Sequence, residues 1–326
     1  MIDRQKLGSS WHPVALSSEI SGSVPLARQC RGREYVLFRD RKGVARALED
    51  RCAHRRAPLS MGQINDAGQI QCPYHGWTFE GDSGRCVAIP NLGKNEAVPG
   101  DYRVEKYPLV EKWGLAFLWV DAGKEADENL LPKLDFKAGK QGSEGEALLT
   151  LPWRAFVDTL LDAPSLVLAE KGMSIIDDHL LGEPFREDGW FVVERAATWS
   201  RRGGKRKLVP ADYPLVFRTR LDSFTGIACL ELVDEGNRLL FSVVIASVPV
   251  TGTVTAAYWR VARQYRSEPA LDGKLADKCR SIELAVSDKV DARRLLQVHP
   301  YVSGYWRGDI NVYSIEQASA RKGKAS

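Results

Sequence analysis

The sequence predicts an α+β protein of two domains, an all-β domain followed by a domain that combines helices with antiparallel strands. Short apolar and aromatic segments separated by turn residues fill about the first 120 positions, which is typical of β-strands. Helical periodicity appears only from residue 153, and strand-like segments follow across 190–260. A chain of 326 residues is also long enough for two hydrophobic cores.

The first domain opens with candidate strands. Residues 11–16 combine an aromatic residue with apolar ones, and residues 34–39 and 44–48 flank the turn sequence Asp-Arg-Lys-Gly at 40–43. A short polar segment that ends in glycine between two apolar segments is a β-hairpin signal. We therefore expect a hairpin here, within an all-β domain.

Two short motifs follow the hairpin. Cys52-x-His54 and Cys72-x-x-His75 are separated by 17 residues. Two thiolates and two imidazoles suit a [2Fe–2S] cluster in which one iron takes two Cys and the other takes two His, the Rieske arrangement. We therefore expect these four residues to bind one such cluster.

A Cys₂His₂ set also suits a structural zinc ion. Zinc fingers place a helix after the second ligand pair, whereas residues 77–79 and 86–90 have the pattern of strands around a turn at 81–84. This context favours the cluster over zinc.

Residues 52–62 and 72–79 resemble the Rieske domain of the Rieske non-haem iron oxygenases, and residues 84–90 and 107–114 extend the resemblance. The most similar subgroup has a single α-type chain as its oxygenase component and carries out O-demethylation and ring hydroxylation. The resemblance implies a Rieske [2Fe–2S] domain over residues 1–122.

The second half matches more weakly, through the order of its elements. A segment rich in Gly, Lys, Glu and Asp at 123–146 is the expected linker, with a long surface loop inside one domain as the alternative. The second domain, 147–326, begins with helical spacing over 153–170, which Pro164 disturbs, and a last helix is expected at 282–291. The resemblance implies a helix-grip (START-like) domain, an antiparallel sheet with flanking helices.

The family also carries a mononuclear iron in this domain, and here the sequence departs from the family pattern. A family helix bears Asp-x-x-His-x-x-x-x-His, and a later helix supplies a carboxylate for Fe(II). In this chain the Asp is Asp162, but Ser165 and Glu170 replace the two histidines. The later carboxylate corresponds to Asp288, with Asp291 as a rival. We therefore expect this chain to lack its own catalytic iron.

Other residues offer only a partial replacement. Outside the cluster motifs the chain has three histidines, of which only His179 lies near the altered motif. An all-oxygen pocket of Ser165, Glu170 and Asp288 would prefer Mg²⁺ or Ca²⁺ to redox iron.

The retained Asp162 has an implied role of its own. In the family this Asp joins a cluster His of one subunit to an iron His of the next, in a head-to-tail ring of three. The resemblance therefore implies that Asp162 is an inter-subunit electron relay. A surface or capping carboxylate is the alternative.

Together these features predict a subunit of a Rieske-type oxygenase, a monooxygenase, demethylase or hydroxylase of a small, ring-containing organic substrate that uses O₂. A ferredoxin and/or flavin reductase fed by NAD(P)H would reduce its cluster. The electrons would pass to the iron of a homologous partner subunit in a mixed ring, a trimer or hexamer. Two alternatives are an active Rieske monooxygenase with iron held by His179, Glu170 and Asp288, and a non-enzymatic Rieske electron carrier.

The composition argues against other classes. The net charge is only +4 and no basic stripe interleaved with aromatics appears, which argues against nucleic acid. No apolar run approaches the ~18–20 residues that cross a bilayer, and residues 1–6 lack a signal-peptide core, so we expect a cytoplasmic protein. The basic segment 201–207 is either a solvated hairpin tip or a docking site for an acidic ferredoxin. Four cysteines without partners at ligand spacing are expected to be small buried residues: Cys30, Cys86, Cys229 and Cys279.

Overall fold

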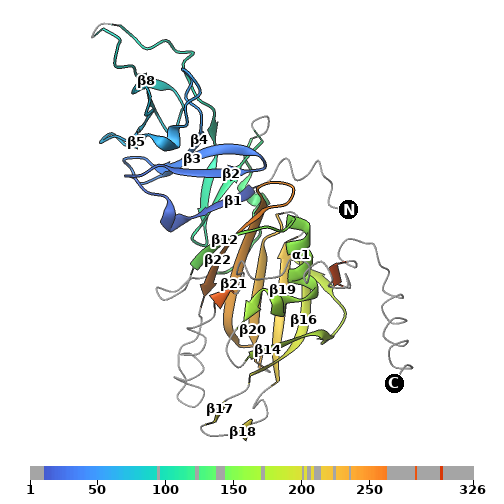
Figure 1. The fold of residues 1–326 in the computed structure, drawn as a ribbon. Helices are drawn as coiled ribbons and strands as arrows, with labels where there is room; N and C mark the ends of the chain where they lie inside the picture. The colour runs from blue at the N-terminus through green and yellow to red at the C-terminus, as the bar shows by residue number, and fades with distance from the viewer. Residues whose placement is uncertain are drawn as a thin grey trace. The chain divides into compact units, whose positions relative to one another are not determined.

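The chain divides into two compact units in a computed structural model (Figure 1). The N-terminal unit contains Gly8–Leu131 with the short segment Ser247–Gly252, and the rest of the chain forms the C-terminal unit. The predicted linker, 123–146, includes a 3₁₀ turn, η4 (Glu128–Leu130), and the first residues of a strand, β12 (Glu144–Leu149). The structure describes residues 11–93, 96–121, 125–136, 144–169, 173–199, 202–203, 207–208, 214–222, 225–234, 236–262, 283–284 and 302–303.

The described N-terminal unit is built from strands and short 3₁₀ turns, as predicted. Its antiparallel sheets have the strand orders β1-β11-β10, β2-β3-β4-β9 and β5-β6-β7-β8. The elements are β1 (Trp11–Leu16), η2 (Ser17–Glu19), β2 (Leu26–Cys30), β3 (Arg33–Arg39), β4 (Ala45–Glu49), η3 (Leu59–Met61), β5 (Gln63–Ile64), β6 (Ile70–Gln71), β7 (Thr78–Phe79), β8 (Cys86–Ala88), β9 (Lys106–Tyr107), β10 (Leu109–Lys112) and β11 (Leu115–Trp119).

Strands β3 and β4 form the predicted hairpin. The N–H of Gly43 donates to the carbonyl of Asp40 at 2.9 Å and closes the turn. Gly43 has a φ of +77°, which glycine adopts without a steric cost. The hairpin buries Val36, Phe38 and Leu48 in the core that also contains the cysteines of the two ligand motifs.

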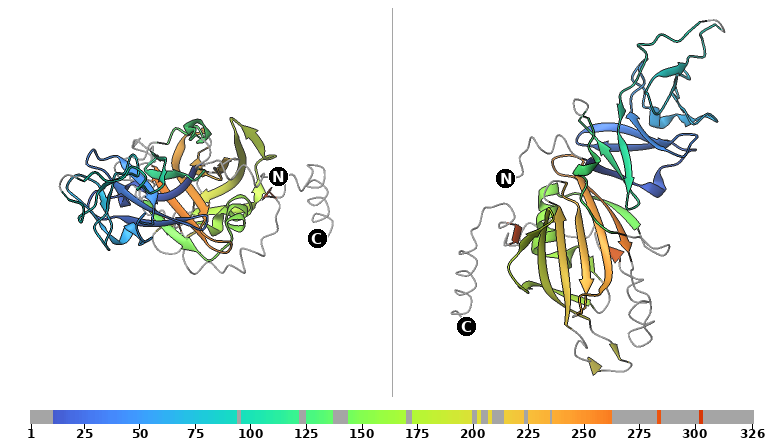
Figure 2. Two further views of the ribbon diagram at one scale, coloured as in Figure 1. Left: turned by 90° about the horizontal axis from the view of Figure 1, so that it is seen from above. Right: turned by 180° about the vertical axis from the view of Figure 1, so that it is seen from behind.

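An antiparallel sheet forms the centre of the C-terminal unit (Figures 1 and 2). Its strand order is β12-β22-β21-β20-β19-β16-β14, and β15 pairs with β16. Its strands after β12 are β14 (Met173–Leu180), β15 (Phe185–Glu187), β16 (Trp190–Trp199), β19 (Pro214–Asp222), β20 (Ala228–Val233), β21 (Leu239–Pro249) and β22 (Thr255–Ala262). A separate hairpin in the basic segment pairs β17 (Arg202–Gly203) with β18 (Lys207–Leu208).

Helix α1 (Trp153–Asp162) packs its apolar side against this sheet. Phe156 and Leu160 of the helix share one core with Phe217 of β19. Burial of each such side chain contributes about 1.5–3 kcal/mol. The helix ends at Asp162 because Pro164 has no N–H to continue the ladder, and a 3₁₀ turn, η5 (Pro164–Leu166), follows.

The helix predicted at 282–291 is not helical in its described part. Its two described residues, Glu283–Leu284, form β23, which pairs with β13 (Leu168–Ala169) just after η5. Apolar spacing indicated a helix, but pairing with this distant segment satisfies the backbone groups of both strands. The rest of the predicted helix lies outside the described residues.

Candidate metal centres

The two ligand loops of the N-terminal unit are built alike. The first follows β4, and the second connects β6 to β7. In each loop the cysteine N–H donates to the carbonyl five residues on, and the N–H four residues on donates back to the cysteine carbonyl, at 2.8–3.2 Å. The residue four positions after each cysteine, Arg56 or Gly76, has a positive φ of 60° or 71°. One backbone path therefore serves both ligand pairs.

The two histidines face each other at the outer side of the site. His54 is exposed and His75 is half-buried. Their Nδ1 atoms lie 3.1 Å apart. Two nitrogens bound to one metal at about 2.0–2.1 Å in a tetrahedral arrangement would lie ~3.4 Å apart, so the two imidazoles are spaced to bind one metal ion.

The two cysteines lie on the inner side. Cys52 and Cys72 are 1% and 4% exposed, and their side chains are within hydrogen-bonding reach of each other. Burial raises the pKa of the Cys52 thiol to about 11, and the N–H groups of His54 and Arg55 partly oppose this shift. Ligation must therefore displace a proton from the Cys52 thiol. The donor set thus fits a binuclear cluster with one iron on buried sulfurs and the other on surface imidazoles.

The electrostatics of His54 agree with a role as a neutral ligand. The pKa of His54 is lowered by desolvation and then by the neighbouring His75 and Arg55. A neutral imidazole offers the nitrogen lone pair that a metal needs.

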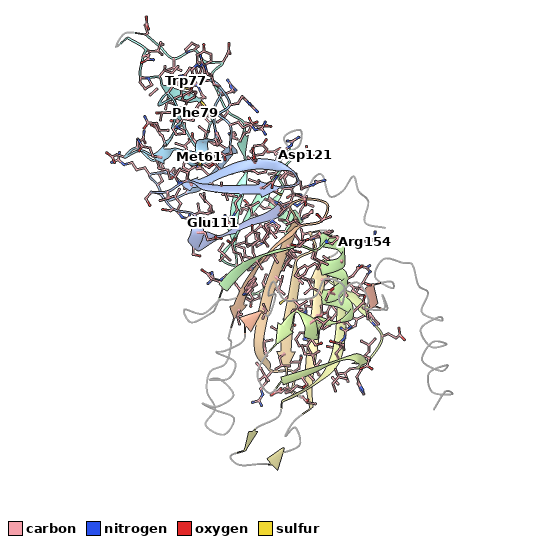
Figure 3. All side chains as sticks on the ribbon, viewed as in Figure 1. Met61, Trp77, Phe79, Glu111, Asp121 and Arg154 are labelled. Carbon is pink, nitrogen blue, oxygen red and sulfur yellow. The ribbon has the colours of Figure 1, made fainter. Side chains whose placement is uncertain are left out.

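Aromatic rings flank both histidines, which the spacing of the Cys and His residues did not predict. The His54 ring stacks on Trp77 with centroids 4.8 Å apart and planes 3° apart, and Tyr102 lies 4.9 Å beyond Trp77. The ring of Tyr74 lies 3.9 Å from that of His75. The sequence did contain a signal for these contacts, because Tyr74 and Trp77 lie inside the motif Cys-Pro-Tyr-His-Gly-Trp. Trp77, Phe79 and Met61 are labelled in Figure 3.

A buried carboxylate fixes the far end of the first loop. Asp50 is 6% exposed, and its Oδ1 accepts the N–H of Ser60 at 2.7 Å while its Oδ2 accepts the Ser60 hydroxyl at 2.5 Å. The N–H of Asp50 donates to the carbonyl of Glu34. The two ends of the loop are therefore joined to each other through Asp50 and Ser60, and Asp50 is also bound to β3.

The C-terminal unit brings together only part of the second predicted site. Asp162 accepts hydrogen bonds on Oδ1 from the N–H groups of Val302 and Ser303, at 2.7 and 3.0 Å, and on Oδ2 from the Ser303 hydroxyl, at 2.5 Å. Ser165 donates through its N–H and its hydroxyl to the carboxylate of Asp177. His179 is exposed on β14. Three predicted positions lie outside the described residues: Glu170, Asp288 and Asp291.

These described donors do not fit a mononuclear iron. Both carboxylate oxygens of Asp162 accept hydrogen bonds from 302–303, and the Ser165 hydroxyl is directed to Asp177. A redox iron of this type takes two imidazoles and a carboxylate with open positions. Within the described parts of the chain, no three His, Cys, Asp or Glu side chains are placed to hold a single metal ion.

Comparison with known proteins identifies the class of the fold. A family description, "Rieske [2Fe-2S] domain", matches residues 10–108. Over 97% of its length the chain superposes on 99% of dicamba monooxygenase bound to dicamba, with a TM-score of 0.67 at 20% identity. Caffeine-bound NdmA from Pseudomonas putida CBB5 gives a TM-score of 0.61 at 20% identity, over 93% of this chain and 92% of that one. The chain therefore carries a Rieske [2Fe–2S] domain within the fold of the Rieske non-haem iron oxygenases.

Curated proteins that are similar to this chain in sequence have names of several kinds. The chain is 37% identical over 218 residues to "Protein TIC 55, chloroplastic" of Arabidopsis thaliana, covering 64% of this chain and 40% of the relative. It is 38% identical over 156 residues to a "putative toluene-4-sulfonate monooxygenase system iron-sulfur subunit TsaM2" of Comamonas testosteroni, covering 47% and 43%. It is 36% identical over 175 residues to "4beta-methylsterol monooxygenase" of Methylococcus capsulatus, covering 53% and 44%. The chain thus spans less than half the length of these curated relatives.

Among the described residues, no helix combines the length and the apolar character that crossing a bilayer requires.

Proposed function

We propose that this chain is a subunit of a Rieske-type oxygenase whose [2Fe–2S] cluster passes electrons to the mononuclear iron of a partner subunit. The observation that carries the proposal is the contrast between the two centres. Cys52, His54, Cys72 and His75 form a ligand set that fits a cluster. In the second centre, Asp162 and Ser165 are engaged in hydrogen bonds within the chain, and the imidazoles are replaced.

When bound, the cluster supplies one-electron transfer at a potential of roughly −150 to +300 mV. The protein holds the two cysteines in an apolar core, where water is excluded from the sulfurs. It exposes the imidazole of His54 at the surface, so that a partner's redox centre can approach this side without crossing a protein layer. The thiols are buried, while the imidazole of His54 is exposed and that of His75 is half-buried, which gives the site one side for electron exchange.

The proposed partners follow from this chemistry. A ferredoxin and/or flavin reductase fed by NAD(P)H would supply electrons, and a homologous iron-bearing chain in a mixed ring would receive them. Tyr74 and Tyr102 are exposed beside the site, where their rings contact His75 and Trp77, and exposed aromatic side chains at this position support a protein partner. In this arrangement Asp162 would be the relay only if a partner's histidine displaces one of its hydrogen bonds to 302–303. We place the assembly in the cytoplasm, where reduced thiols are available for cluster assembly.

The proposed substrate is a small, ring-containing organic molecule, oxidised at the partner's iron with O₂. This extends to the present chain what the names of its relatives state, such as a methylsterol and toluene-4-sulfonate monooxygenases.

The test is substrate-dependent O₂ uptake by the cluster-loaded chain, with and without an iron-bearing homologous chain. A ferredoxin, its reductase and NADH supply the electrons. We expect no uptake by the lone chain and uptake by the mixture, abolished when the ligand variant Cys72→Ser replaces the wild-type chain. Uptake by the lone chain would establish the active-monooxygenase alternative. A mixture that works equally well with Cys72→Ser would leave this cluster without a role.

A further inference from the structure

The carbonyl of Gly76, directly after the ligand His75, is held by two side chains. Nε2 of Gln71 donates to this oxygen at 3.3 Å, and Oγ1 of Thr78 donates to it at 3.1 Å. A carbonyl oxygen has two lone pairs, so these two donors satisfy both of them. Gln71 ends β6 and Thr78 begins β7, so the two strands that flank the second ligand loop hold its last peptide group.

The conformation of Gly76 makes such a hold necessary. Its φ is 71°, and glycine can leave this left-handed conformation for an extended one at little cost. A change of this kind would turn the peptide group that follows His75 and would move the imidazole with it. The backbone of the loop alone therefore does not fix this ligand.

Gln71 is itself held in place. It is half-buried, and Nε2 of Gln63, its partner across the β5–β6 pair, donates to its Oε1 at 2.6 Å. Because Gln63 engages the oxygen of the amide, the nitrogen of the amide is directed to Gly76. A chain of hydrogen bonds thus runs from β5 through Gln71 to the carbonyl beside His75.

The first ligand loop lacks glutamine at the corresponding position. The residue directly before Cys52 is Arg51, whose guanidinium pairs with Glu34 at 3.3 Å instead. The Gln71 contact is therefore a feature of the loop that carries His75 and does not belong to the backbone path that the two loops share.

We infer that Gln71 is a positioning residue for His75, because its amide fixes the peptide group after the histidine and keeps the imidazole facing His54. The Nδ1 atoms of the two histidines lie 3.1 Å apart, so a turn of the loop would change the spacing of the two nitrogens. Groups that orient metal ligands in this way contribute to metal affinity without touching the metal. The inference rests on the proposed function, in which these ligands hold a [2Fe–2S] cluster.

The variant Gln71→Glu tests the inference in the cluster-loaded full chain. It has nearly the same shape and keeps the acceptor for Gln63, but its carboxylate has no N–H to donate to Gly76. We expect the EPR spectrum of the reduced cluster to change, because the imidazoles shift. We also expect loss of the cluster to a chelator about tenfold faster than in the wild type, the lower end of the range for groups that orient metal ligands.

Two further variants serve as comparisons. Gln71→Leu removes the same donor without adding a charge, and it should show both changes. The matched control is Gln69→Glu in the same hairpin, where the side chain accepts from Nδ2 of Asn65 and can still do so after the change. It should match the wild type in both measurements.

If either Gln71 variant matches the wild type in EPR spectrum and loss rate, or if Gln69→Glu changes them equally, the inference is overturned. The proposed function fails separately, if the wild-type chain binds no cluster or if the mixture with an iron-bearing chain takes up O₂ equally well with Cys72→Ser.

Discussion

At the scale of single residues, the sulfur ligands of the cluster site are more deeply buried than its nitrogen ligands. The thiols of Cys52 and Cys72 are enclosed, while His54 is exposed. Because water surrounds His54, its orientation depends on the few groups that touch it, and the ring of Trp77 stacks on it in parallel. Trp77 is therefore a positioning residue for this ligand.

Replacement of Trp77 tests this role. We expect Trp77→Leu to assemble the cluster, because all four ligands remain, but to lose it to a chelator several times faster than wild type. Trp77→Phe should resemble wild type, since it keeps an aromatic face against His54. The measurement is the decay of visible absorption under chelator. Equal decay rates for Trp77→Leu and Trp77→Phe would contradict a role for aromatic stacking on His54.

Buried acidic protons predict a loss of stability at alkaline pH. Burial raises the pKa of Cys30 from 9.0 to about 12 and that of Tyr35 from 10.0 to about 12. Because both values are raised in the folded state, their stabilising contribution is complete below pH 9 and is lost as the pH rises toward 12. The urea midpoint should therefore fall between pH 9 and 11, and fall less steeply for Cys30→Ala. A midpoint that is constant over this range contradicts the assignment.

At the scale of elements, the two ligand loops share one backbone path but differ at their left-handed residue. Gly76 has a φ of 71°, and a Cβ there would lie 2.8 Å from Cγ of Pro90. Arg56, at the equivalent position, has a φ of 60° and carries a side chain that pairs with Glu49 at the surface. The left-handed backbone is therefore strained at Arg56, which has a Cβ, and unstrained at Gly76, which has none.

This difference predicts unequal effects of substitution at the two positions on stability. Gly76→Ala should destabilise the folded chain by about 1–2 kcal/mol or more, from the left-handed backbone and the contact with Pro90. Arg56→Gly should change stability by less than about 1 kcal/mol, because relief of strain offsets the loss of an exposed ion pair. Chemical unfolding of both variants is the measurement. Equal destabilisation would contradict the account of the loops.

The elements also show what the sequence could predict. Spacing predicted four cluster ligands, and the structure brings these four side chains together from two short loops. The turn ending in Gly43 predicted the β3–β4 hairpin. Pro164 indicated where the first helix would be disturbed. Local pattern could not predict that Asp162 would receive Val302 and Ser303, or that Arg195 would lie beneath α1. Those contacts join residues 34 to 141 positions apart, and only the assembled sheet brings them together.

At the scale of the whole molecule, one chain combines a centre whose donors fit a redox cluster with a second centre filled by its own side chains. In the N-terminal unit, thiols and imidazoles converge in pairs. In the C-terminal unit, the carboxylates of Asp162 at the end of α1 and of Asp177 on β14 accept hydrogen bonds from serine hydroxyls. Under the proposed function, such a chain would carry electrons and would depend on another subunit for oxygen chemistry.

The iron content of the purified, cluster-reconstituted chain tests this account most directly. It should contain two iron atoms per chain with the spectrum of a Rieske cluster, and Cys72→Ser should contain none. Cys86→Ala is the matched control, since Cys86 lies in the same core without being a ligand, and it should keep both irons. A third iron that persists in Cys72→Ser would contradict the account.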